Sequence, residues 1–342
     1  MVETEEINLL SNHWMPSCDF SAKRSNFADQ TFRDFDEQAQ QLIGHDQSYT
    51  QLTAGAFRGR FFSAFLGAEV AVHMEVCNQA LEQEVAGSAD HFSFGVVLSE
   101  GEYFRANGRD QSKDDVFVIP PSGALHMISP VHGAVLAISV NQRVLLEHAN
   151  LVPAVGDWLG NLGPQVGFLR SPRLATRLRE DVVSAVESAA IAPCAVDHAM
   201  VGAALLGSIV SKLSLEWSGA IPVKGWAGEK SFDRFWKGRG WLLGGDGSLD
   251  DHTGIVSALK QSRRTVEQAF SDQVSLGPLT YLRIHRLHKV RRCLQNDQLA
   301  DQTIGDIAAE HGFWDWSRFT QHYRRHFGEL PSTTRQISML GG

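Results

Sequence analysis

The sequence has few cysteines, no long apolar run and no leader pattern. Its four cysteines (Cys18, Cys77, Cys194 and Cys293) lie far apart and form no C-x-x-C pair, which argues against a disulfide framework or a zinc site. No stretch approaches the roughly 18 uninterrupted apolar residues of a membrane span. The acidic N-terminus, MVETEEINLL, lacks the basic-then-apolar order of a signal peptide. We therefore expect reduced thiols, no membrane association and a cytoplasmic protein.

Length and composition indicate a globular chain, and the charge distribution sets its C-terminal part apart from the rest. The 342 residues, 43% hydrophobic and 20% charged, predict two or three domains with real cores. From residue 230 onward there are 16 Lys and Arg against 12 Asp and Glu, a net charge of +4. The whole chain carries −8, so the first 229 residues carry −12. This asymmetry predicts that the C-terminal part meets a polyanion.

Periodicity and turn residues predict an α+β chain. Short alternating strands with Gly and Pro punctuation are typical of a sandwich or small barrel, and later segments show helical spacing. The apolar stripe Val201, Leu205, Ile209 and Leu213 either packs on the β domain or forms a dimer seam. The predicted divisions are an extension (1–45), a β-rich regulatory domain (46–145), a helical dimerisation or packing region (146–217), a linker (218–231) and an all-α domain (232–342).

Two short helices near the C-terminus are separated by a glycine turn. Thr303 caps the first, with Asp306 at the capping-box position, and Gly312 follows its last turn. Asp315 caps the second helix, whose aromatic face and polar face are distinct. The aromatic residues are Phe319, Tyr323 and Phe327, and the polar face carries Trp316, Ser317, Thr320, Gln321 and Arg324. The arrangement indicates a helix-turn-helix that reads the DNA major groove; the alternative is a helical hairpin with a solvated polar face.

A fainter copy of this pattern stands 52 residues earlier. Val256 and Lys260 precede Ala308 and Gly312 by that interval, and Ser262 caps the next helix. A basic helix from residue 279 to about 294 joins the two copies. Two recognition helices on one rod would enter successive major grooves, about 34 Å apart.

The second copy resembles the DNA-binding domain of the AraC/XylS family of bacterial transcription regulators. The family pattern I-x-x-I-A-x-x-x-G-F-x-(D/S)-x-S-x-F continues to (F/Y)-(K/R)-(K/R)-x-F-G-x-x-P-S. It is matched here by Ile304, Ile307, Ala308, Gly312, Phe313, Asp315, Ser317, Phe319, Tyr323, Arg324, Arg325, Phe327, Gly328, Pro331 and Ser332. The first copy departs from the family, since Val256 replaces the usual Ala and Lys260 the usual turn Gly.

The resemblance implies a transcription factor, acting as activator or repressor, that binds double-stranded promoter DNA and works with RNA polymerase, as a monomer or a homodimer. By position, the implied base contacts are Arg264, Glu267, Gln268, Trp316, Ser317, Thr320 and Gln321. Arg263, Arg318, Arg324 and Arg325 are expected at phosphates.

The front domain, by the same resemblance, is a cupin-like β-barrel that senses a small-molecule effector, similar in layout to the subgroup that includes the ethanolamine-utilisation regulator. Candidate effector residues are Arg58, Arg60, His73 and His126. The alternation in FRGRFF puts Arg58 and Arg60 on one face, either solvated or holding an anion. We expect no metal or cofactor, although His73-x-Glu75 echoes metal cupins. The alternatives are a metal-dependent cupin enzyme with a DNA-binding tail, and an architectural DNA-binding protein without effector.

Overall fold

The computed structural model describes residues 26–42, 45–99, 104–191, 194–216, 221–222, 228–244 and 252–341. The chain divides into two compact units. The first takes Met1–Tyr49 and Arg58–Trp226, and the second takes Thr50–Phe57 and Ala227–Gly342. Because the first is β-rich and the second helical, the α+β prediction is confirmed.

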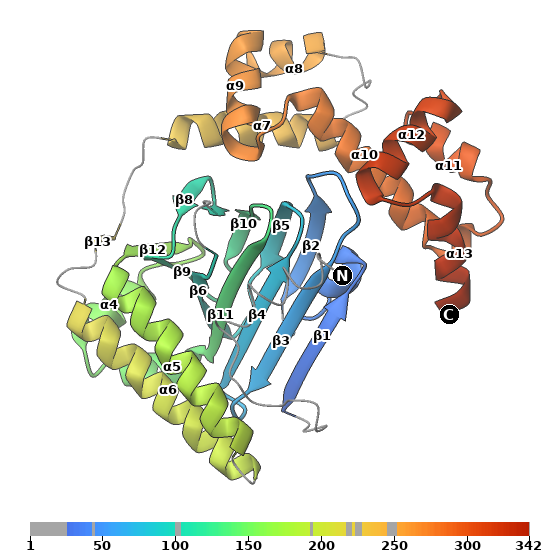
Figure 1. Cartoon of the computed structure of the whole chain (residues 1–342). Coiled ribbons are helices and arrows are strands. Elements are labelled where there is room, and N and C mark those ends of the chain that lie inside the picture. The colour runs from blue at the N-terminus through green and yellow to red at the C-terminus, as the bar shows by residue number, and fades with distance from the viewer. Residues whose placement is uncertain are drawn as a thin grey trace. The chain divides into compact units, whose positions relative to one another are not determined.

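The β-rich unit contains two open sheets (Figure 1). The larger has eight strands in the order β1-β3-β4-β11-β6-β9-β12-β13, and the smaller has five in the order β2-β5-β10-β7-β8. The strands are β1 (Phe27–Phe32), β2 (Asp46–Gln51), β3 (Gly59–Phe65), β4 (Val70–Cys77), β5 (Leu81–Ala86), β6 (His91–Val97), β7 (Phe104–Ala106), β8 (Arg109–Gln111), β9 (Asp115–Ile119), β10 (Ala124–Ile128), β11 (Gly133–Asn141), β12 (Gly167–Arg170) and β13 (Ile221–Pro222).

The closed barrel implied by the family resemblance is not seen among the described strands. Each ladder ends at strands paired on one side only, β1 and β13 in one sheet and β2 and β8 in the other. The β fold also starts earlier than residue 46. Both β1, which pairs antiparallel with β3, and the helix α2 (Phe35–Ala39) lie within residues 1–45, which the sequence assigned to an extension.

Strand alternation gives the larger sheet two different faces. In β4, Val72 and Met74 join a core formed with the helices of the unit. The residues between and after them, His73 and Glu75, line a cavity shared with Gln83 of the smaller sheet. Since successive side chains of a strand point to opposite faces, this one strand serves both the core and the cavity.

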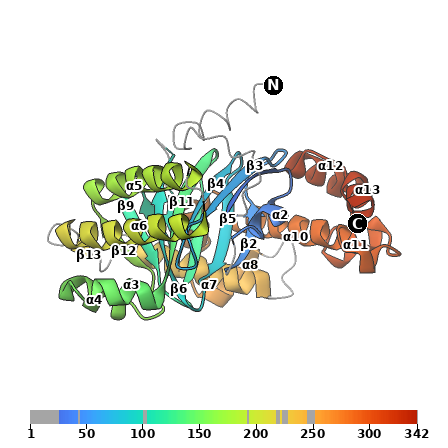
Figure 2. The ribbon, with the colours of Figure 1, turned by 90° about the horizontal axis from the view of Figure 1, so that it is seen from below.

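Helices cover one face of the larger sheet. They are α3 (Gln142–Ala149), α4 (Pro153–Gly160), α5 (Pro172–Ile191) and α6 (Ala195–Glu216). Figures 1 and 2 both show α5 and α6 side by side. On α6, Leu205, Ile209 and Leu213 are buried in the core, and Val201 packs against it. The stripe therefore packs on the core of the β-rich unit, which is one of the two alternatives predicted for it.

α6 also has the length and apolar composition of a membrane-spanning helix over Val196–Glu216. One of its faces is nevertheless committed to the core through Leu205, Ile209 and Leu213. That burial is typical of a helix that packs on a protein core.

The second unit is helical. Its elements are α7 (Glu229–Gly244), α8 (His252–Leu259), α9 (Arg263–Val274), α10 (Pro278–Leu294), the 3₁₀ helix η1 (Asp297–Leu299), α11 (Ile304–Glu310), α12 (Trp316–Phe327) and α13 (Pro331–Gly341). The predicted joining helix is confirmed as α10. α7 begins inside the expected linker 218–231, most of which lies outside the described residues.

Candidate functional site

The turn between α11 and α12 contains the helix-capping residues that the sequence predicted. Thr303 Oγ1 accepts from the Asp306 backbone N–H at 3.1 Å and donates to Asp306 Oδ2 at 2.6 Å. Gly312 has φ +85°, a left-handed conformation that favours glycine. Asp315 Oδ1 then accepts from the Arg318 N–H at 3.0 Å and starts α12. These bonds satisfy orphan donors at both helix starts.

α12 separates an aromatic face from a polar face. Phe319, Tyr323 and Phe327 are at most 5% exposed, and consecutive rings of this row lie 5.7 and 4.7 Å apart. On the other face Ser317 and Gln321 are exposed, and Thr320 is half-buried with its hydroxyl donating to Trp316 O at 2.9 Å. Trp316 is 52% exposed. The helix therefore offers a polar surface held on a rigid apolar base.

Basic side chains accompany that polar surface. Arg318, Arg324 and Arg325 are all exposed on α12. Arg318 Nε lies 3.4 Å from Asp315 Oδ2 within the same helix start. Exposed guanidinium groups beside donors of this kind suit a phosphate backbone flanking readable base edges.

The first helix pair, α8 and α9, keeps the same plan with a different core. Ser262 Oγ accepts from the Thr265 N–H at 3.2 Å, as expected of a cap. Phe270 of α9 packs edge-on against Phe235 of α7 and Tyr281 of α10, with centroids 5.0 and 5.4 Å apart. Gly238 of α7 allows this, because a Cβ there would stand 2.9 Å from the Phe270 ring.

The polar residues of α9 partly pair with each other. Arg263 Nε donates to Glu267 Oε1 at 2.8 Å, and Gln268 Nε2 donates to Asp272 Oδ1 at 2.6 Å. Arg264 and Gln268 are exposed, and Glu267 is half-buried. DNA would have to compete with exposed pairs of this type, which are weak.

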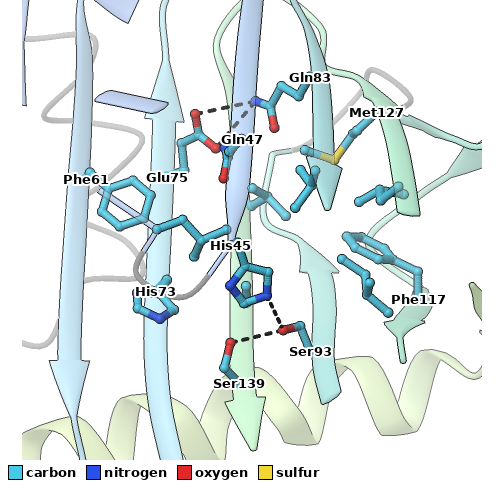
Figure 3. Close-up of a pocket in the computed structure, with 16 residues that line it drawn as sticks. His45, Gln47, Phe61, His73, Glu75, Gln83, Ser93, Phe117, Met127 and Ser139 are labelled. Carbon is cyan, nitrogen blue, oxygen red and sulfur yellow. Dashed lines mark hydrogen bonds between the residues drawn. The ribbon is translucent and has the colours of Figure 1, made fainter. Parts of the chain in front are cut away.

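A second candidate site is a cavity of about 50 Å³ between the two sheets of the β-rich unit (Figure 3). One wall comes from β3, β4, β6, β9 and β11 and the other from β2, β5 and β10. The residues lining it are Leu42, His45, Gln47, Phe61, His73, Glu75, Gln83, Val85, Ser93, Phe117, Ile119, Leu125, Met127, Val135, Ala137 and Ser139.

The polar groups of the cavity gather at two ends, as Figure 3 shows. At one end His45 Nε2 lies 3.1 Å from Ser93 Oγ, which is 3.0 Å from Ser139 Oγ. Nearby, His73 Nδ1 lies 3.0 Å from Ser63 Oγ, and burial together with the charge of His45 lowers the pKa of His73 to about 3. His73 is therefore neutral at physiological pH.

The other end is organised around the buried carboxylate of Glu75. Its Oε1 accepts from Gln38 Nε2 at 3.0 Å, and Gln83 Nε2 lies 3.4 Å from both oxygens. Tyr49 and Cys77 also hydrogen-bond this carboxyl. Burial raises the pKa of Glu75, while these hydrogen bonds act in the opposite direction.

Of the four residues expected at an effector site, only His73 lines this cavity. Arg60 lies on the opposite face from Phe61 and binds Asp29 through Nε and Nη2 at 2.7 and 2.6 Å. His126 alternates with Leu125 and Met127 and pairs with buried Glu82 at 2.7 Å. Arg58 is half-buried and is not among the lining residues. Strand alternation in β3 and β10 directs Arg60 and His126 away from the cavity, and Arg58 precedes β3.

The sequence interpretation missed most of the cavity. Gln47, Gln83, Ser93 and Ser139 belong to strands far apart in the chain, and no local pattern joins them. The spacing His73-x-Glu75 was the available signal, because two residues apart on a strand share a face. Within the described residues, no three His, Cys, Asp or Glu side chains group as a metal site.

Comparisons with known proteins converge on the helical unit. A family model described as a helix-turn-helix domain matches residues 255–337. The "XylDLEGF operon transcriptional activator 2" of Pseudomonas putida is 37% identical over 79 residues, which are 23% of this chain and 50% of that protein. The "HTH-type transcriptional activator RhaS" of Citrobacter koseri is 33% identical over 95 residues, 26% of this chain and 33% of that protein.

Residues 255–337 form an AraC-type helix-turn-helix domain. This chain spans half or less of the length of these two relatives, so the match concerns the domain. Two solved structures resemble the chain at low similarity. The AraC-like transcriptional activator CuxR has a TM-score of 0.39 at 18% identity, over 76% of this chain and 94% of CuxR. ToxT from Vibrio cholerae O395 has a TM-score of 0.28 at 8% identity, over 87% of this chain and 98% of ToxT.

The AraC-type domain is braced by a buried ionic network. Arg291 of α10 is 7% exposed, pairs with Glu329 and donates to Thr334 Oγ1 at 3.2 Å. Tyr323 of α12 joins the same hydroxyl at 2.8 Å. The network links α10, α12 and α13, so it fixes the orientation of α12.

The unit that contains the AraC-type domain also includes the segment Thr50–Phe57. The Gln51 carbonyl accepts from His288 Nε2 of α10 at 3.1 Å and from His326 Nε2 of α12 at 3.0 Å. The Gly55 N–H and Gln51 Nε2 both donate to His326 O. Gly328, with φ +76°, ends α12 where a Cβ would meet Ala56 at 3.0 Å. The segment therefore packs on the C-terminal end of α12.

The first turn of the AraC-type domain shows how Lys260 replaces a glycine. Lys260 adopts φ +50°, the same left-handed region as Gly312, which costs an L-residue about 1–2 kcal/mol. We expect Lys260→Gly to be neutral or to raise the free energy of unfolding by up to about 1 kcal/mol, after the entropy cost of glycine. Gly312→Ala should lower it by about 1 kcal/mol or more. Urea midpoints of the two variants would show the contrast, and a clear loss in Lys260→Gly would mean that the lysine side chain stabilises the turn.

Proposed function

We propose that this protein is a transcriptional activator that binds specific double-stranded DNA sequences and responds to a small molecule held in its β-rich unit. The proposal rests on the two faces of α12 in the AraC-type domain. Its phenyl rings are buried while Ser317, Gln321 and the three arginines are exposed. The relatives aligned over this region are named as transcriptional activators, and activation implies a contact with RNA polymerase in the cytoplasm.

Two recognition helices share the proposed readout. Arg264, Glu267 and Gln268 of α9 would address one half-site, and Trp316, Ser317, Thr320 and Gln321 of α12 the other. Arg263, Arg318, Arg324 and Arg325 would contact phosphates. Exposed Trp316 fits an apolar contact with a thymine methyl or a sugar better than a hydrogen bond to a base.

The cavity supports the regulatory half of the proposal. It is concave, mostly apolar and has a few polar groups at defined places, which is the usual composition of a small-molecule site. Occupation of this site would shift the affinity of the protein for DNA only if the ligand binds the two states of the protein unequally. DNA affinity measured with and without ligand tests that coupling.

DNA selection tests the proposal directly. Gel-shift titration against a randomised duplex library at two salt concentrations should enrich one sequence family, with affinity that falls as salt rises. Enrichment of no sequence would contradict specific readout and would favour an architectural role.

Two substitutions on α12 separate base reading from phosphate binding. We expect Gln321→Ala to lose about 1–3 kcal/mol of discrimination at one base position. Arg324→Ala should instead weaken all sequences similarly and reduce the salt slope by about one. Fluorescence anisotropy with the selected duplex and its single-base variants measures both. If neither variant differs from the parent protein, the proposed orientation of α12 on DNA is wrong.

A further inference from the structure

The polar side chains at one end of the cavity between the two sheets turn their polar atoms toward one another. His45 Nε2 lies 3.1 Å from Ser93 Oγ, which is 3.0 Å from Ser139 Oγ. His73 Nδ1 lies 3.0 Å from Ser63 Oγ. Because these groups are engaged with each other, the surface that the lining residues expose to the cavity is almost wholly apolar.

The carboxyl group of Glu75, at the other end, is closed off in the same way. It accepts hydrogen bonds from the side chains of Gln38, Tyr49, Cys77 and Gln83. The Oε1 atoms of Gln47 and Gln83 are themselves buried. The described residues therefore present little polar surface to a ligand at this end as well.

Small side chains in register form the floor of the cavity. Ala137 of β11 pairs with Gly95 of β6, and Ser139 pairs with Ser93. β11 lies inside the larger sheet between β4 and β6, yet Ala137 is only half-buried, and it lines the cavity. The Phe117 ring lies over Gly95, where a Cβ would meet it at 2.0 Å. The hollow therefore follows from the size of side chains on paired strands.

Charge and size narrow the class of occupant. Among the described residues no Lys or Arg lines the cavity, so an anion has no partner there. The Glu75 carboxyl group already accepts from four side chains, and burying an unpaired charge is costly. A dry apolar cavity of about 150 Å³ holds benzene, and this one measures about 50 Å³. The occupant is therefore uncharged and smaller than benzene.

We propose that the cavity binds a small uncharged apolar molecule, such as a short hydrocarbon or alkyl halide of about four non-hydrogen atoms. Its carbon atoms lie against Phe61, Phe117 and Met127 (Figure 3), and removal of apolar surface from water drives the binding. The inference names the effector class and in that respect rests on the regulatory role proposed above. It replaces the expectation of an anion held by Arg58 and Arg60.

Ligand-observed NMR titration of the full-length protein at pH 7, in sealed tubes, tests the inference with four probes. They are 1-chloropropane, propan-1-ol, propylammonium and butyrate. All four carry a propyl chain and differ only in the head group, which is apolar, a hydroxyl, a cation or an anion. A ligand the size of 1-chloropropane binds no tighter than about tens of micromolar, so titrations must extend into the millimolar range.

The four affinities should fall in the order of head-group polarity. We expect 1-chloropropane to bind at least about fivefold more tightly than propan-1-ol, because the hydroxyl loses its hydrogen bonds to water on entry. Propylammonium and butyrate should bind at least about 100-fold more weakly than 1-chloropropane, because an unpaired charge costs more to bury than a hydroxyl.

Two substitutions on β11 should change binding in opposite directions. Ala137→Leu fills the floor of the cavity and should weaken 1-chloropropane binding at least about tenfold. Val135→Ala enlarges the cavity and should raise the affinity of 1-chlorobutane relative to 1-chloropropane about fourfold, as for one more buried methylene. Ala203→Leu makes the filling change at an exposed position of α6 and should leave every affinity unchanged. Circular dichroism checks that the three variants fold.

Three outcomes would overturn the inference. They are no binding of 1-chloropropane up to its solubility limit, equal or tighter binding of propylammonium or butyrate, and unchanged relative affinities in Val135→Ala together with unchanged binding in folded Ala137→Leu. DNA affinity measured with and without 1-chloropropane answers a separate question. If the chloride binds as expected but DNA affinity does not change, the ligand class stands and the proposed effector role fails. If a charged probe binds and shifts DNA affinity, the effector role stands and the apolar assignment fails.

Discussion

Phe319→Ala is expected to unfold the second helix-turn-helix at moderate temperature. The Phe319 side chain is 1% exposed, and its ring packs 5.2 Å from Phe313 and 5.7 Å from Tyr323. Truncating a buried phenylalanine costs about 3–5 kcal/mol through lost burial and the cavity left behind. Domains have a free energy of unfolding of only about 5–15 kcal/mol, so this unit would lose much of its stability. DNA affinity should fall more than 100-fold wherever the unfolded form dominates.

Because the chain has two units, a single unfolding midpoint would not report this effect cleanly. Hydrogen exchange of peptides from α11 and α12 measures the local opening directly. Gln321→Ala, two residues further along the same helix on its exposed face, is the matched control and should change protection by less than about 0.5 kcal/mol. If both variants opened the helix equally, the assignment of buried and exposed faces on α12 would be wrong.

The AraC-type domain was predictable because its signals are local. Thr303, Asp306, Gly312 and Asp315 act within one turn of where they stand, and an aromatic residue every four positions defines one helix face. Even Lys260, which departs from the glycine pattern, takes the left-handed conformation that the turn requires. The sequence therefore predicted both helix pairs and the joining helix α10 close to their observed bounds.

The cavity could be predicted only in part, because it depends on long-range pairing. FRGRFF correctly indicated alternation, but alternation does not say which face is covered. Phe61 lines the cavity while Arg60 pairs with Asp29 of β1. No local pattern within residues 1–45 predicted that β1 would pair with β3. The choice between His73 and His126 depended in the same way on which side of each sheet is enclosed.

The packing of Thr50–Phe57 on α10 and α12 could not be predicted from any local sequence pattern. Its hydrogen bonds join Gln51 to residues 237 and 275 positions away. His288 and His326 looked like ordinary positions in basic helices. Their partner is a backbone carbonyl, which carries no residue-specific signature in a sequence.

Mild acid should destabilise the helical unit through this histidine pair. His326 is 6% exposed, and burial lowers its pKa to about 4. Burial, followed by the charges of His326, Arg292 and His285, lowers the pKa of His288 well below its usual range. The two rings are 5.5 Å apart, so protonation of both would also set like charges against each other.

The sign of the effect follows from proton binding. Between pH 6.5 and about 4 the unfolded chain protonates these histidines while the folded unit keeps them neutral, so the unfolded state binds more protons. Stability is therefore complete above pH 6.5 and is lost as pH falls toward 4. For His326 alone, lowering the pKa from 6.5 to about 4 corresponds to about 3 kcal/mol, and His288 adds to it in the same direction.

Hydrogen exchange of α10 and α12 peptides at pH 7 and pH 4.5, corrected for intrinsic exchange, measures this loss within the helical unit. His326→Gln keeps an N–H donor for the Gln51 carbonyl but cannot titrate, so it should reduce the pH dependence by about one proton. His322→Gln lies one turn earlier on α12, where the ring is half-buried and its pKa is lowered mainly by burial. That variant should remove a smaller part of the dependence. An identical pH response in His326→Gln and the parent protein would show that the buried pair does not control acid stability.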